Sequence, residues 1–254
     1  MNKEILFITG HRRSGTTMFA NLFDDHKSFC VYPSDLCILY AYYPNFIGKG
    51  YSYKLKKERI ISVLKNDLSN VLSEGDLLKR FNLKIFLKEM EKKINVKNID
   101  NISKITKLLL ESYIKTLKPK NNFRYLVIKE TSADIFAFKI KNWFKKIKFI
   151  QIVRDPRDNY SSLKAKHKKH YSKFGESEKK LLASLINRAK LDLKFSKINQ
   201  KLIGKKKYKT IKYENLVNKP KEELKKICKY LNVKFNNNLL YPSILGYKTI
   251  GNSY

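Results

Sequence analysis

Residues 10–17 read Gly10-His11-Arg12-Arg13-Ser14-Gly15-Thr16-Thr17. The segment before them, residues 3–9, is short, largely apolar and β-branched, which predicts a buried strand. The segment after them, residues 16–23, predicts a helix. In a glycine-containing loop between a strand and a helix, backbone N–H groups point toward an anion. The stretch therefore predicts a phosphate-binding loop in an α/β fold.

The loop differs from a nucleotide-hydrolysing P-loop at one position. In the form Gly-x4-Gly-Lys-[Ser/Thr], the lysine contacts the β- and γ-phosphates and the hydroxyl residue holds magnesium. Here Thr16 stands at the lysine position, and the cations Arg12 and Arg13 lie inside the loop. An ordinary glycine-rich turn would account for Gly10 and Gly15, but not for two adjacent arginines. We therefore expect a phosphate cradle with altered NTPase chemistry.

A second motif follows the apolar segment 148–153, which predicts another buried strand. It reads Arg154-Asp155-Pro156-Arg157-Asp158-Asn159-Tyr160-Ser161-Ser162. Asp155 followed by Pro156 is typical of a helix start. Arg154 is then at the carboxyl end of a strand, where open α/β sheets bind ligands, and its guanidinium can bind two phosphate oxygens at once. A surface arginine before a helix is the alternative for this motif alone.

Two further strand ends carry polar side chains. Residues 209–212 precede Tyr213-Glu214-Asn215-Leu216, and a helix begins near Pro220, with Leu224, Ile227, Cys228 and Leu231 on one face. Lys129, within Val127-Ile128-Lys129-Glu130-Thr131, ends another predicted strand. Taken alone, Tyr213 is as well explained by a core aromatic residue, and Lys129 with Glu130 by a solvated pair.

In this order, the motifs resemble those of the sulfotransferases that use 3′-phosphoadenosine 5′-phosphosulfate (PAPS), including bacterial, carbohydrate and tyrosylprotein sulfotransferases. That family carries a loop of the form Gly-x-x-[Arg/Lys]-Ser-Gly-Thr-Thr, an Arg-Asp-Pro-Arg motif with a serine eight residues after its first arginine, and a Tyr-Glu-Asp-Leu element. The resemblance runs from residue 4 to residue 252, with an interruption at residues 45–122.

The resemblance implies roles for particular residues. The 5′-phosphosulfate would be bound by Arg12, Arg13, Ser14, Gly15, Thr16 and Thr17, the 3′-phosphate by Arg154 and Ser162, and the adenine would lie near Tyr213. Arg13 would also act in catalysis by stabilising charge on the leaving phosphate, and Lys129 would face the transferring group. No metal is implied, since a sulfuryl group carries less negative charge than a γ-phosphoryl group.

A general base is expected within hydrogen-bond reach of the acceptor, and similar enzymes use a Glu or His. Asp35 lies close to the position where tyrosylprotein sulfotransferases place their glutamate, but it is an aspartate and is shifted in register. His26 and Glu130 are the alternatives. Each of the three is equally explained as a capping or surface residue.

The fold expected from these motifs is α/β, a three-layer P-loop-type parallel sheet flanked by helices. We expect a single sulfotransferase-like domain over residues 1–254, with a helical insertion at about 45–122 forming an acceptor-side cap. Two apolar stripes predict amphipathic helices in the insertion: Ile60, Ile61, Leu64, Leu68 and Leu72, and then Ile105, Leu108, Leu109 and Leu117. A natural C-terminus and a truncation after Tyr254 are equally compatible with the sequence.

The composition is strongly basic, with 55 Lys and Arg against 22 Asp and Glu and a net charge of +33 over 254 residues. The lysines are scattered through every segment, as on solvated faces, and no specific nucleic-acid-binding signature accompanies them. Such a field attracts anionic acceptors and favours peripheral contact with anionic membranes. Polyanion binding as the main activity is the alternative.

The remaining residue types predict a cytoplasmic protein. Cys30, Cys37 and Cys228 are odd in number and unpaired by motif, which indicates reduced thiols. His167 and His170 have helical spacing, but no carboxylate or cysteine set accompanies them as a metal site requires, so a solvated face is expected. No segment is apolar for long enough to cross a membrane.

The predicted activity is transfer of a sulfuryl group from PAPS to an acceptor hydroxyl or amine. Among acceptors, a saccharide or glycolipid is favoured because the loop resembles bacterial and carbohydrate enzymes, and a peptide stays open. Two alternatives remain: a P-loop kinase-like phosphotransferase, which predicts magnesium-ATP binding without a role for Arg154, and a non-catalytic anion-binding module. The sequence makes no prediction of oligomeric state.

Overall fold

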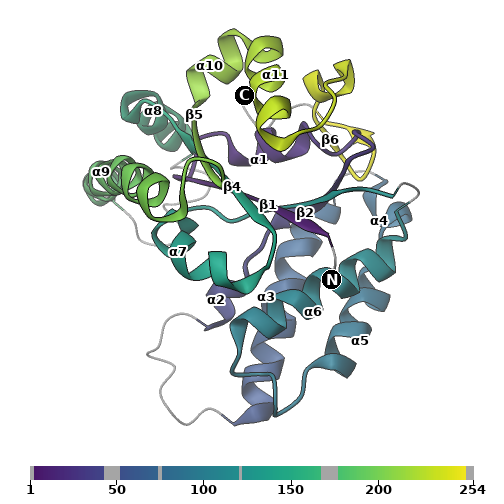
Figure 1. Ribbon diagram of the computed structural model, residues 1–254. Coiled ribbons are helices and arrows are strands. Elements are labelled where there is room, and N and C mark those ends of the chain that lie inside the picture. The colour runs from purple at the N-terminus through teal and green to yellow at the C-terminus, as the bar shows by residue number, and fades with distance from the viewer. Residues whose placement is uncertain (1–2, 43–51, 74–75, 120–121, 167–176, 250–254) are drawn as a thin grey trace.

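The computed structural model describes residues 3–42, 52–73, 76–119, 122–166 and 177–249, and the sheet lies at its centre (Figure 1). Within these residues the sheet has five parallel strands in the order β2-β3-β1-β4-β5. They are β1 (Glu4–Gly10), β2 (Phe29–Asp35), β3 (Tyr125–Lys129), β4 (Ile147–Val153) and β5 (Tyr208–Lys212). This sheet confirms the expected α/β class.

β1 is the central strand and is buried on both faces. Its residues from Ile5 to Gly10 are all buried, as expected for a parallel strand covered by helices on each side. Because parallel strands all point the same way, the loops after β1, β2, β3, β4 and β5 gather at one edge of the sheet. The phosphate loop and Arg154 follow β1 and β4, so they meet there.

Three helices cover one face of the sheet: α1 (Thr16–Asn21), α10 (Tyr213–Asn218) and α11 (Pro220–Leu231) (Figure 1). They pack on Leu6 and Ile8 of β1 through buried side chains that include Phe19, Leu216, Leu224, Ile227 and Leu231. The predicted apolar face of the last helix is therefore buried, and α11 begins at Pro220 as expected.

The helices between β2 and β3 cover the opposite face. They are α2 (Ile38–Tyr42), α3 (Tyr53–Leu72), α4 (Leu77–Arg80), α5 (Leu83–Lys93) and α6 (Ile102–Leu117). Of these, α2 precedes the predicted insertion at about 45–122. The stripe Ile60, Leu64, Leu68 and Leu72 is buried, in the same apolar cluster as Ile5 and Phe7 of β1. These helices thus form the third layer of the fold, and among their described residues Asn70 and Val71 at the end of α3 reach the ligand edge. Their role as an acceptor cap stays a prediction.

The β4–β5 side of the sheet is flanked by α7 (Ala137–Ile140), α8 (Pro156–Lys166), α9 (Glu178–Ile203) and the 3-10 turns η1 (Ala133–Phe136) and η2 (Lys141–Trp143). The 3-10 turn η5 (Asn237–Leu240) and the hairpin of β6 (Ser243–Ile244) and β7 (Tyr247–Lys248) instead contact Asp24 and Asp25, which follow α1. The Asp24 carboxylate fixes the hairpin, because its Oδ2 accepts from Ser243 Oγ at 2.9 Å and from the Gly246 N–H at 2.7 Å.

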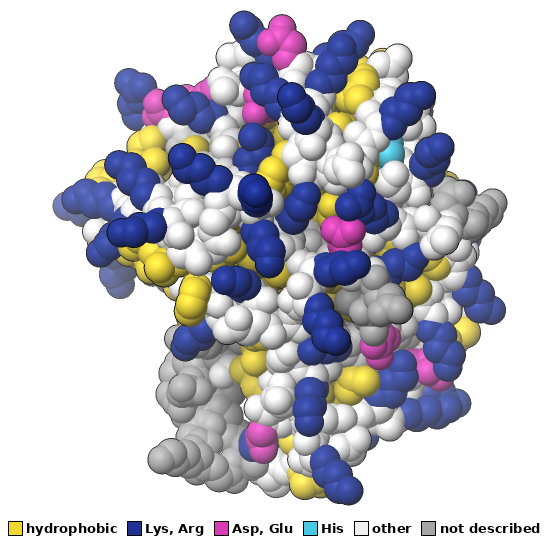
Figure 2. All heavy atoms as spheres, in the orientation of Figure 1, with side chains coloured by type: hydrophobic (Ala, Val, Ile, Leu, Met, Phe, Trp, Pro, Cys, Tyr) yellow, Lys and Arg dark blue, Asp and Glu magenta, His cyan; other side chains and the backbone are white. Residues whose placement is uncertain are grey.

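Lysines and arginines cover the visible face of the molecule, with few acidic side chains between them (Figure 2). Among the described residues, no helix is long and apolar enough to cross a membrane. The three cysteines are free, as expected. His167, His170 and the C-terminal residues 250–254 lie outside the described part of the chain.

Candidate functional site

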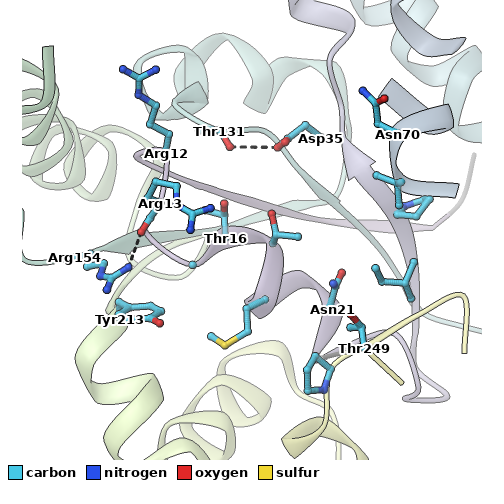
Figure 3. Close-up of a pocket in the computed structure, with 17 residues that line it drawn as sticks. Arg12, Arg13, Thr16, Asn21, Asp35, Asn70, Thr131, Arg154, Tyr213 and Thr249 are labelled. Atoms are coloured by element: carbon cyan, nitrogen blue, oxygen red, sulfur yellow. Dashed lines mark hydrogen bonds between the residues drawn. The ribbon is translucent and has the colours of Figure 1, made fainter. Parts of the chain in front are cut away.

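A pocket of about 470 Å³ opens at the carboxyl edge of the sheet (Figure 3). Its lining brings the predicted motifs together: Arg12, Arg13, Gly15, Thr16 and Thr17 from the loop, Asp35 from β2, Arg154 after β4, and Tyr213 after β5. The other lining residues are Met18, Asn21, Pro33, Asn70, Val71, Thr131, Pro242, Ile244 and Thr249. The pocket is therefore polar and basic on the loop side.

The phosphate loop is held in an unusual backbone conformation. Gly15 has a φ of 89° and Arg13 a φ of 68°, both in the left-handed region. A Cβ on Gly15 would lie 2.5 Å from the ring of Tyr213, so the close contact of this ring with the loop requires glycine. Ser14 closes the loop internally, since its Oγ donates to the His11 carbonyl at 2.5 Å. Ser14 is buried and does not line the pocket.

Arg154 joins three segments that are far apart in the sequence. Its NH1 donates to the Arg13 carbonyl at 2.8 Å, and its guanidinium lies 4.3 Å from the centroid of the Tyr213 ring (Figure 3). Arg13 in turn donates from Nε to Ser162 Oγ at 3.0 Å. The first, second and third motifs therefore form one connected cluster, in which Arg13, Arg154 and Tyr213 line the pocket and Ser162 does not.

The Nε–H of Arg154 is buried and has no hydrogen-bond partner. A buried donor without a partner costs free energy unless a ligand satisfies it. Arg157 differs, because its side chain is 89% exposed and pairs with the Asp155 carboxylate at 2.7 Å. Asp155 Oδ1 also accepts from the Arg157 backbone N–H at 2.8 Å, so this pair serves the start of α8 rather than the pocket.

Asp35 is the carboxylate at the pocket wall. Its Oδ1 lies 2.9 Å from Lys129 Nζ and accepts from Thr131 Oγ1 at 3.3 Å. The Asp35 side chain is 32% exposed, whereas that of Lys129 is 3% exposed. Lys129 is absent from the pocket lining, so the structure places it behind Asp35 as a counter-ion. A carboxyl group at the pocket wall, held in place by Lys129 and Thr131, is placed to act as a general base.

The two alternative bases lie elsewhere. Glu130 is 1% exposed, and its Oε2 accepts from the Cys37 backbone N–H at 2.7 Å. Burial and the nearby Asp35 raise the pKa of Glu130 well above its usual range. His26 precedes β2, at the end of the strand away from the pocket, where its Nε2 contacts the Lys234 carbonyl at 2.9 Å. Neither side chain lines the pocket.

Comparison with known proteins decides the family. The model of the sulfotransferase family matches residues 6–237, nearly the whole chain. This protein belongs to the sulfotransferase family. Members of the family move a sulfuryl group, so the pocket is the candidate active site for that transfer. No curated protein matches the sequence significantly.

Solved sulfotransferase structures share the fold. The sulfotransferase domain from the curacin biosynthetic pathway has a TM-score of 0.61 and 22% identity, with 94% of this chain and 77% of that chain covered. The domain from the Synechococcus PCC 7002 olefin synthase also has a TM-score of 0.61, with 19% identity over 95% of this chain and 78% of that one. A sulfotransferase from Alicyclobacillus acidocaldarius has a TM-score of 0.54 and 12% identity, with coverages of 98% and 87%.

Some lining residues of this sulfotransferase carry no sequence signal. Asn21 comes from α1, Asn70 from the end of α3, and Thr249 follows the β6–β7 hairpin. No motif contains them, and only the packing of their elements brings them to the pocket. Within the described residues, no group of three His, Cys, Asp or Glu side chains is arranged as a metal site.

Proposed function

We propose that this sulfotransferase takes its sulfuryl group from PAPS and releases adenosine 3′,5′-bisphosphate. The observation that carries the proposal is the cluster of Arg13, Arg154, Ser162 and Tyr213, in which two cations and an aromatic ring meet at one pocket. A donor with two separate phosphate groups and an adenine matches this set. The unpartnered Nε–H of Arg154 supports the match, since a phosphate oxygen would satisfy it.

In this proposal the loop binds the 5′-phosphosulfate. The side chain of Arg13, the hydroxyls of Thr16 and Thr17, and loop N–H groups would contact it, with Arg12 adding positive charge and Ser14 closing the loop from within. Arg154 and Ser162 would bind the 3′-phosphate, and Tyr213 would lie beside the adenine. Arg13 would stabilise the negative charge that develops on the leaving 5′-phosphate. Its guanidinium is a hydrogen-bond donor that is already in place before the reaction.

Asp35 would act as the general base. The acceptor oxygen would form a bond to sulfur while its proton passes to the Asp35 carboxylate and the bond from sulfur to the bridging phosphate oxygen breaks. Lys129, at 2.9 Å, would fix the orientation of the Asp35 carboxyl group. Lys129 is then a positioning residue for the base instead of a contact of the transferring group.

The acceptor wall favours a saccharide, either free or as the head of a glycolipid. Asn21, Asn70, Thr131 and Thr249 line the pocket with amide and hydroxyl groups, and Thr131 contacts Asp35. The apolar lining residues outside the loop motif are Met18, Pro33, Val71, Pro242 and Ile244. Side chains that both donate and accept hydrogen bonds suit an acceptor with several hydroxyl groups. A panel of mono- and oligosaccharides, lipid-linked sugars and tyrosine peptides tests this preference with radiolabelled PAPS.

The first experiment is calorimetric titration of wild type and Arg154→Ala with adenosine 3′,5′-bisphosphate and with magnesium-ATP. We expect micromolar binding of the bisphosphate, a loss of at least about 30-fold in the variant, and much weaker ATP binding. Arg157→Ala is the matched control, because Arg157 lies in the same motif but points to solvent. Tight magnesium-ATP binding that is indifferent to Arg154 would support the kinase-like alternative instead. Bisphosphate binding without turnover of any acceptor would support the non-catalytic module.

A further inference from the structure

Asn159 is a buried polar side chain in the first turn of α8. It is 2% exposed, and its backbone N–H donates to the Asp155 carbonyl at 3.0 Å. Burying its side-chain amide costs free energy unless both ends are hydrogen-bonded. A residue that is unfavourable locally needs a compensating contact elsewhere.

That contact is the phosphate loop. The amide orientation that gives both ends a partner has Nδ2 donating to the carbonyls of Arg12 and Arg13, each at 3.0 Å. Its Oδ1 then accepts from His11 Nδ1 at 3.2 Å. The reverse orientation would set the amide oxygen against two carbonyl oxygens, which is repulsive. One side chain therefore bonds three consecutive loop residues.

The contact falls on the strained part of the loop. Arg13 has a φ of 68°, which a non-glycine residue adopts only when its surroundings impose it. Its carbonyl accepts from Arg154 at 2.8 Å and from Asn159 at 3.0 Å, so both lone pairs are used. Asn159 and Arg154 together impose the backbone shape that aims Arg13 at the pocket.

The first side chain of the loop that bonds Asn159 is buried and neutral. His11 is 3% exposed, and burial lowers the pKa of its ring to about 4, so it is neutral near pH 7. The nearby charge of Arg188 on α9 also lowers this pKa, and Arg188 pairs with Asp192 at 2.9 Å. Arg188 also pairs with Asp134. A neutral His11 with Nδ1 protonated is the donor that Asn159 Oδ1 requires.

We propose that Asn159 is a positioning residue that holds the phosphate loop in its anion-binding shape before any ligand arrives. The expected effect of Asn159 on donor binding rests on the proposed function, whereas its expected effect on the loop conformation does not. An aspartate of the same size could still accept from His11, but it has no N–H for the carbonyls of Arg12 and Arg13. Position 159 therefore requires an amide group, and a side chain of the same volume alone is not sufficient.

The test compares ligand-free wild type, Asn159→Asp and Asn159→Val by hydrogen exchange. We expect the amides of residues 11–17 to exchange roughly tenfold or more faster in both variants, with β3 unchanged. Ser161→Ala, an exposed position on the same helix, is the control and should match wild type. Unchanged loop exchange in folded variants overturns the proposal, as does a uniform increase throughout the protein.

A second readout separates positioning from a general loss of structure. In both variants we expect the KM for PAPS and the Kd for the bisphosphate to rise roughly 10- to 100-fold, while kcat at saturating PAPS and the acceptor KM stay within about twofold. A fall in kcat with an unchanged KM for PAPS would contradict a positioning role. If wild type binds no bisphosphate, the proposed function fails, and the loop exchange alone decides the role of Asn159.

Discussion

At the scale of single residues, two neighbouring carboxyl groups differ in their surroundings and therefore in what they can do. Asp35 is at the pocket wall, where its Oδ1 lies 2.9 Å from Lys129 Nζ. Glu130 is buried, and the raised pKa of its carboxyl favours the protonated, neutral form. Only the first is placed to accept a proton from an acceptor.

This contrast predicts opposite outcomes for two amide substitutions. Asp35→Asn should lower kcat roughly 10²- to 10⁴-fold, because an amide cannot take the proton of the acceptor. Glu130→Gln should stay within a few-fold of wild type, since glutamine is neutral and its oxygen still accepts from the Cys37 N–H. Initial rates with PAPS and a competent acceptor, and bisphosphate titration to confirm intact binding, measure both. A large loss for Glu130→Gln alone would reverse the assignment.

The sequence predicted which residues form the donor site, but it did not predict how they contact one another. Arg13, Arg154 and Tyr213 belong to motifs whose order and strand-end positions predicted that they would meet. That Arg154 binds the Arg13 carbonyl was not predictable, because it depends on the approach of residues 141 positions apart. Nothing in the sequence distinguishes Asn159 from the rest of its motif, because a helical asparagine gives no sign of what its amide contacts.

At the scale of elements, α3 also has one property that the sequence predicts and one that it does not. The apolar stripe at helical spacing predicted an amphipathic helix in this segment, and α3 buries Leu64 and Leu68 within the main apolar cluster. The sequence could not indicate which surface the stripe would cover. Periodicity defines one apolar face of a helix, whereas the sheet face that receives it is chosen by the packing of the whole domain.

A pair of truncations in α3 tests this packing. Leu68→Ala should lower the free energy of unfolding by about 2–5 kcal/mol, because the side chain is fully buried and its removal leaves a cavity. Leu55→Ala, on the same helix but 44% exposed, should change it by about 0.5 kcal/mol or less. Urea denaturation followed by circular dichroism measures both. Equal effects would mean that α3 is not a structural layer of the fold.

At the scale of the whole molecule, the dominant property is charge. The net charge of +33 is spread over the surface, and the donor pocket is itself lined by Arg12, Arg13 and Arg154. A field of one sign that surrounds a cationic pocket speeds the arrival of an anion more than it prolongs binding. The net positive charge is therefore expected mainly to raise the association rate of the anionic donor.

The association rate of the bisphosphate should fall roughly tenfold between ionic strengths of about 0.02 and 0.2 M, as mobile ions screen the exposed charges. Its dissociation rate should change much less, because the contacts in the pocket are short-range. Stopped-flow fluorescence with a labelled bisphosphate measures both rates. Labelled adenosine, which has no charge, serves as the control and should associate at a salt-independent rate.

The cluster around Arg154 also has a consequence for how the protein acquires its activity. The bond from Arg13 to Ser162 spans 149 residues of chain, and Tyr213 completes the cluster only after β5 has joined the sheet. Contacts of such long range form slowly during folding. Partly folded chains would contain the complete loop sequence and yet capture no donor. During refolding, ligand capture should therefore recover with the slowest kinetic phase, after most secondary structure has returned.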